Sequence, residues 1–139
     1  MKQDLSLKEV GKNEWFFTYP SIYDKAQDFF FDGIEELESG NSKKAIVKFK
    51  QTLALFPQHI DALHHLSLLT EDATEARRLN ETAVEFGLSA FPKNFDLQKS
   101  KLEWGWIENR PFLRVYQSKA LFLLENNPNE ALKLFLQLL

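Results

Sequence analysis

The chain has 139 residues, of which 44% are hydrophobic, and its net charge at pH 7 is −3. This length suits one domain with its own core, and the slight acidity argues against nucleic-acid binding, which normally requires a basic face. The absence of cysteine excludes disulfides, thiolate metal sites and cysteine nucleophiles. Because we find neither a signal peptide nor an apolar run of about 20 residues, we expect a cytoplasmic protein without a membrane partner.

The order of apolar and helix-ending residues predicts six short helices and essentially no β-sheet. Residues 1–19 form an N-terminal tail that is polar at first and ends in the aromatic stretch WFFTY, which can dock on the helices. Residues 20–57 form the first predicted helix hairpin. In this hairpin Gly40 provides a C-cap between two apolar stripes of helical spacing, and Pro57 ends the second helix.

The rest of the chain predicts two more hairpins separated by an irregular segment. Residues 58–92 form the second hairpin, in which Asp72 and Glu75 have the spacing of a capping box at the start of the second helix. Residues 93–110 form the connector. The third hairpin, residues 111–139, begins with a proline in its first helical turn, where the missing N–H costs nothing.

One short pattern in the first hairpin has the spacing of a known helical repeat. Three residues separate Ala45 from Phe49, and a proline closes the unit. This pattern resembles the tetratricopeptide repeat, whose signature contains the same step from a small to an aromatic residue, followed by proline. Ala131 and Phe135 have this spacing in the third hairpin, whereas the second departs from it because Asn80 takes the place of the aromatic residue.

The resemblance implies an all-α fold, a right-handed superhelix of about three stacked antiparallel hairpins, which binds a protein or peptide through its groove. The sequence contains no phosphate-binding loop, nucleophile elbow or metal motif, so we expect a non-enzymatic interaction scaffold with no catalytic residue, no cofactor and no metal. Phe30, Ile34 and Leu37 lie on the side of the first helix that such repeats turn towards the groove. The expected occupant is therefore an apolar target, or the aromatic end of the tail folding back.

The two helices of the first hairpin carry opposite charges. The charged residues are Asp32, Glu35, Glu36 and Glu38 in the first helix and Lys43, Lys44, Lys48 and Lys50 in the second. One interpretation is a site for a charged peptide. We favour the simpler one, in which both faces are solvated and are joined by ion pairs of small individual worth.

The stretch LEWGWIENRPFLR, residues 102–114, has three interpretations. As a connector, it leads into the next helix, and Trp104 and Trp106 fill the space above the helix ends. As a binding surface, the two tryptophans and Arg110 or Arg114 anchor a partner, because these residue types dominate interface hot spots. The third interpretation is a catalytic site.

The catalytic interpretation requires Glu103 and Glu108 to act as paired carboxylates, but no histidine or nucleophile lies nearby in the sequence. The same two residues have a structural role in the connector interpretation. Arg110 and Arg114 lie near a helix start, where cations are unfavourable. We therefore predict that Glu108 or Glu103 forms a hydrogen-bonded contact with one of these arginines and pins the loop.

Three histidines lie close together in the second hairpin. Asp61 and His65 are four residues apart and share a helical face, which is a usable spacing for metal ligands, whereas His64 points elsewhere. His59 precedes them. We favour a solvated helix surface and predict no metal site.

The last run, ALKLFLQLL, is apolar on almost every face of a helix. A terminal repeat needs a polar outer face for solubility, so either more chain follows in the natural protein or this helix pairs with another molecule. The second case gives the alternative function, an assembly segment that forms a homodimer through Leu132–Leu139. In that case Leu134 and Leu138 belong to the interface, and polar residues there would dissociate the dimer.

Overall fold

The computed structural model describes residues 4–95, 100–124 and 127–138, and it is mostly helical. Its elements in chain order are β1 (Ser6–Glu9), β2 (Glu14–Thr18), α1 (Ile22–Glu38), α2 (Ser42–Leu55), α3 (Ile60–Leu69), α4 (Ala73–Ser89), β3 (Lys101–Leu102), the short 3₁₀ helix η1 (Ile107–Asn109), α5 (Arg110–Leu123) and α6 (Pro128–Gln137).

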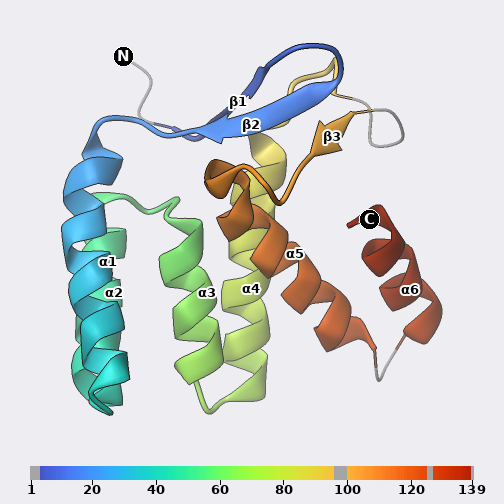
Figure 1. The fold of residues 1–139 in the computed structure, drawn as a ribbon. Helices are drawn as coiled ribbons and strands as arrows, with labels where there is room; N and C mark the ends of the chain where they lie inside the picture. The colour runs from blue at the N-terminus through green and yellow to red at the C-terminus, as the bar shows by residue number, and fades with distance from the viewer. Residues whose placement is uncertain (1–3, 96–99, 125–126, 139) are drawn as a thin grey trace.

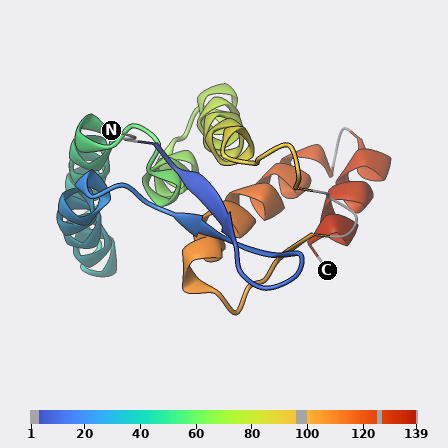
Figure 2. The same cartoon turned by 90° about the horizontal axis from the view of Figure 1, so that it is seen from above.

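In this part of the chain, the helices pair as consecutive hairpins, α1 with α2, α3 with α4 and α5 with α6 (Figure 1). Neighbouring hairpins also touch, because α2 packs on α3, and α5 packs on both α3 and α4. Seen from above, the pairs follow one another along the molecule, with the strands lying across their ends (Figure 2). Each hairpin thus packs on its neighbour in the series.

Small residues lie where the helices approach most closely. Ala45 is fully buried between the helices of the first hairpin. A Cβ atom added to Gly33 would lie only 2.6 Å from the Phe49 ring, so glycine lets the two helices meet over that ring. Gly87 faces Phe112 in the same way between α4 and α5, and a methyl group there would overlap the ring.

Two of the predicted helix boundaries have the expected chemistry. Gly40 ends α1 in the left-handed region, with φ at +81°, as a C-cap glycine should. Asp72 caps α4, since its carboxylate accepts a hydrogen bond of 3.0 Å from the N–H of Thr74. The predicted capping box is nevertheless incomplete, because the Glu75 carboxylate binds the Arg78 guanidinium one turn further along the helix.

A three-stranded sheet lies across one end of the helices, so the prediction of essentially no sheet is wrong (Figure 1). β2 pairs antiparallel with β1 and parallel with β3. Phe17 of β2 is buried against the helices and Trp15 is buried beside Phe95 of the connector, whereas Phe16 points the other way and stacks on Trp106 at a centroid distance of 5.1 Å. Because aromatic residues cover both faces, the alternation of apolar and polar residues that marks a strand is missing.

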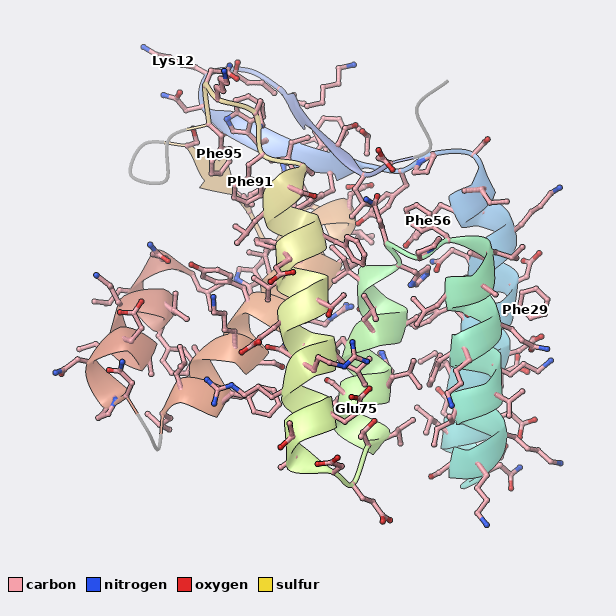
Figure 3. The ribbon with its side chains drawn as sticks, turned by 180° about the vertical axis from the view of Figure 1, so that it is seen from behind. Lys12, Phe29, Phe56, Glu75, Phe91 and Phe95 are labelled. Carbon is pink, nitrogen blue, oxygen red and sulfur yellow. The ribbon has the colours of Figure 1, made fainter. Side chains whose placement is uncertain are left out.

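The N-terminal residues belong to the core. Leu5 and Phe17 lie in one cluster with Phe56 and Phe112, so the sheet and all three hairpins share buried contacts. Figure 3 shows Phe91 beneath the sheet at the end of α4, where its ring packs against those of Phe17 and Phe112. The aromatic end of the predicted tail therefore packs on the ends of the helices.

One buried side chain joins this sheet to the connector. Asn109 is fully buried, and its Oδ1 accepts a hydrogen bond of 2.9 Å from the N–H of Phe17. Its Nδ2 donates to the carbonyl oxygens of Trp15 at 3.0 Å and Glu103 at 3.3 Å. Asn109 precedes α5 but makes no side-chain cap there, so its amide links strands and connector.

Candidate functional site

A groove with a volume of about 600 Å³ lies between α1, α3 and the start of α5. The arrangement of the hairpins explains it. α1 packs on α2, while α3 packs on α4 and α5, so the space between α1 and α3 stays open. The volume lies within the usual range for ligand sites, and most of the lining surface is apolar.

One wall of the groove is aromatic. The rings of Tyr19 and Tyr23 stack at 4.2 Å, and Tyr23 lies 5.1 Å from the His59 ring. His59 lies 5.0 Å from Phe30, which continues this row along α1. Phe31 borders the groove and is 55% exposed, so a large apolar side chain remains uncovered on this wall.

The opposite wall comes from η1 and the first turn of α5. Ile107 and Pro111 are its apolar residues, and Ile107 is 68% exposed. The Tyr19 hydroxyl donates a hydrogen bond of 2.6 Å to the Glu108 carbonyl oxygen. Burial raises the pKa of Tyr19 well above its usual value, so this hydroxyl stays protonated and keeps the two walls joined.

The charged residues on the floor of the groove include an ion pair between helices. Arg114 Nη1 lies 2.9 Å and 3.1 Å from the two carboxylate oxygens of Asp61. Asp61 is mostly buried, whereas the Arg114 side chain is partly exposed. This pair joins α3 to α5 and neutralises both charges.

The pair corrects the prediction that Glu108 or Glu103 compensates an arginine. In the described part of the chain neither glutamate forms an ion pair with Arg110 or Arg114. Asp61 takes that role for Arg114. Arg110 instead donates from Nε to the carbonyl oxygen of Trp104 at 2.9 Å. The acidic partner is 53 residues away in sequence, and no local spacing marks it.

The predicted solvated histidine surface is wrong for His59, which is buried. Its Nδ1 accepts a hydrogen bond of 3.0 Å from the N–H of Ala62, and its Nε2 bonds Gln27 Oε1. Burial lowers its pKa from 6.5 to about 4, so the ring is neutral at pH 7. His59 thus caps α3 and supports the aromatic wall.

His64 and His65 both line the groove. Burial lowers the pKa of His64 to about 4. Its Nδ1 is buried without a hydrogen-bond partner among the described residues. His65 Nδ1 donates to the Asp61 carbonyl oxygen at 2.8 Å, while the Asp61 carboxylate is held by Arg114. The described residues contain no cluster of three or more groups that could hold a metal ion.

The structure brings three of the predicted binding residues together in the groove, namely Phe30, Ile34 and Arg114. The other six lie elsewhere. Leu37 packs against the core between α1 and α2. Trp104 and Arg110 meet in the connector, and Trp106 packs on the sheet. Leu134 is buried, and Leu138 lines a smaller cavity with Phe91, Phe112 and Tyr116.

The sequence analysis missed Phe31 and Ile107 as groove residues, and it named Asp61 only as a possible metal ligand and Tyr19 only as the end of the aromatic tail. Phe31 was recognisable in the sequence as a candidate binding residue, because it is a large apolar residue one position away from the stripe of buried residues in α1. Ile107 gives none of these signals, because it belongs to a connector that meets Tyr19, 88 positions away, only in the folded chain. A comparison with protein-family models, curated proteins and solved structures found no match. No helix in the described ranges is long and apolar enough to cross a bilayer.

Proposed function

We propose that this protein is a non-enzymatic interaction module that binds a protein segment in the groove between α1, α3 and α5. One observation carries the proposal. Phe31 and Ile107 border the same groove and are 55% and 68% exposed. Large apolar side chains in a hollow gain free energy when a partner removes them from water, at about 25 cal/mol per Å².

The polar groups of the groove support docking rather than chemistry. Arg114 and Asp61 neutralise each other, and both ring nitrogens of His59 are used in hydrogen bonds within the fold. These contacts fix the walls before a partner arrives, which lowers the ordering cost of binding.

A tetratricopeptide-like superhelix, whose hairpins present such a groove, remains our proposal for the fold family.

The test is a selection of binders from a random library of peptides of about 12 residues. Each selected peptide is then titrated against Phe31→Ser and Ile107→Ser. The matched controls are Val47→Ser and Leu68→Ser, since Val47 is 54% and Leu68 64% exposed and neither lines the groove. Binding weakened about tenfold or more by the groove variants alone supports the proposal. Equal effects of all four variants, or no selected binder, would refute it.

A second candidate function, assembly through the last hairpin, has an observation of its own. Leu132 and Leu136 of α6 are exposed, as are Leu121 and Leu124 near the end of α5. Leu134 is buried instead, so its substitution would damage the fold and cannot report on an interface. The variant to compare by sedimentation equilibrium is Leu132→Ser with Leu136→Ser. A wild-type dimer that becomes monomeric would favour assembly.

A further inference from the structure

The exposed side of α1 beside the groove is acidic. Asp24, Asp28, Glu35 and Glu38 are all exposed, and steps of four and three residues place them on one line along the helix with Phe31. We call these four residues the acidic stripe. Within the described residues none of them forms an ion pair. The stripe borders the aromatic wall along the length of α1.

The basic residues nearest in sequence do not cancel the stripe. Lys25, the sole basic residue of α1, is about 100° from this line, on the side away from the groove. Lys48 of α2 pairs with an acid outside the stripe, because its Nζ lies 3.8 Å from Asp32 Oδ2. The stripe is therefore left with its negative charge.

The groove adds to that charge. Among its lining residues Asp61 and Arg114 cancel, so Glu108 on the opposite wall remains. His64 is neutral at pH 7, because burial lowers its pKa to about 4. A ligand in the groove thus has carboxylates on both sides and aromatic faces along one wall. Carboxylates attract cations, and aromatic faces attract them further through their quadrupoles.

We propose that the groove selects a protein segment in which lysine or arginine side chains flank bulky apolar ones. This inference rests on the proposed function, because it specifies the chemistry of the segment that the groove binds. An apolar side chain of the partner enters between Phe31 and Ile107. The basic side chains on its flanks reach the acidic stripe and Glu108. Acidic segments are repelled, so the charge gives specificity as well as a faster encounter.

Three synthetic peptides of about 15 residues provide the probe. They share leucines at helical spacing and carry lysine, glutamine or glutamate at every flanking position. Fluorescence anisotropy measures their Kd for the full chain at low and high salt. We expect the lysine peptide to bind at least about tenfold more tightly than the glutamate peptide, with the glutamine peptide between them. The difference should shrink in about 1 M salt, where the Debye length is about 3 Å.

A pair of matched variants locates the charge effect. Asp28→Asn with Glu35→Gln removes two charges from the acidic stripe. Glu71→Gln with Glu85→Gln removes two exposed charges from the second hairpin, outside the groove lining. The first variant should weaken the lysine peptide about threefold to tenfold, and the second should leave its affinity within about twofold. Neither should alter binding of the glutamine peptide.

The outcomes separate this inference from the proposed function. Equal weakening by both variants would show attraction to net charge alone and overturn the inference, as would equal or tighter binding of the glutamate peptide. If Phe31→Ser nevertheless weakens all three peptides, the groove still binds segments and the proposed function stands. A wild-type dimer that Asp28→Asn with Glu35→Gln dissociates would make a second copy the occupant and overturn the inference. If no peptide responds to Phe31→Ser, the proposed function itself fails.

Discussion

Asn109→Ala is the most direct test of how the N-terminal strands are held. The amide of Asn109 makes three hydrogen bonds to backbone atoms, with Phe17 and Trp15 of β2 and with Glu103 of the connector. Local helix formation does not need them, since α5 begins without a cap from this side chain. The substitution therefore weakens the contact between segments while leaving the helices intact.

The expected loss follows from the burial of these groups. A hydrogen bond contributes about 0.5–1.5 kcal/mol net, and a buried group left unpaired costs about 1–3 kcal/mol. Asn109→Ala removes three bonds and leaves the N–H of the fully buried Phe17 without this acceptor. Some relaxation will recover part of this, so we expect a loss of about 2–4 kcal/mol. Such a loss is large against a typical total stability of about 5–15 kcal/mol.

Urea unfolding followed by far-UV circular dichroism and by tryptophan fluorescence measures this loss. All three tryptophans lie in β2 or the connector, so fluorescence reports on the region that Asn109 holds. The control is Asn129→Ala, which changes an exposed residue of α6 and should be nearly neutral. A loss below about 0.5 kcal/mol, or one equal to that of the control, would refute the role given to Asn109.

Three further predictions follow from burial. Gly87→Ala should destabilise the fold by about 1–3 kcal/mol in urea, because the methyl group overlaps the Phe112 ring, whereas Gly105→Ala meets open space and should be nearly neutral. Burial holds the His59 pKa at about 4 against 6.5 in the unfolded chain, so the unfolded state binds more protons between these values. The contribution of neutral His59 to the free energy of unfolding is therefore fully present above pH 6.5 and should fall by up to about 3 kcal/mol as the pH drops towards 4. In His59→Gln the free energy of unfolding should depend less steeply on pH in this range, and an unchanged slope would contradict the prediction. Leu134→Ala should cost about 2–4 kcal/mol and Leu136→Ala less than about 0.5 kcal/mol, since the first is buried and the second exposed; equal thermal midpoints would show that α6 is not packed as described.

The helices were predictable from the sequence because their signals are local. A proline, a glycine or a capping side chain marks several of the helix boundaries, and the apolar residues between them have helical spacing. Gly40 and Asp72 act as these rules require. The close approach over Phe49 was also predictable, because a small residue beside an aromatic one is a pattern within a single hairpin.

The sheet was not predictable, because its strands are defined by contacts between distant segments. β3 joins β2 across more than 80 residues, and the two strands share only short pairing. In β2 the outward-facing residue Phe16 is apolar like its buried neighbours, because Trp106 stacks on it where a polar residue would otherwise meet water. A period-two pattern cannot be seen where both faces are aromatic.

For the groove, the sequence identified one wall and missed the other. Phe30 and Ile34 follow from the stripe of α1, whereas Ile107 and Glu108 come from a connector without regular spacing. The predicted partner of Arg114 was wrong for the same reason. The prediction considered only glutamates close to Arg114 in the sequence, whereas its partner Asp61 belongs to another hairpin. The acidic character of α1 was visible in the sequence through Glu35 and Glu38, whereas Asp24 and Asp28 were not singled out.

The position of Tyr19 explains why the groove stays open although an aromatic segment lies next to it. The end of β2 directs Tyr19 onto Tyr23, and its hydroxyl binds the Glu108 carbonyl across the groove. Trp15 and Phe17 are meanwhile buried at the helix ends, where Asn109 holds their backbone. Strand pairing and this amide together keep the aromatic segment from folding back into the groove. Asn109→Ala should thus weaken peptide binding as well as stability, because loss of the strand anchor also frees the tyrosine that joins the two walls.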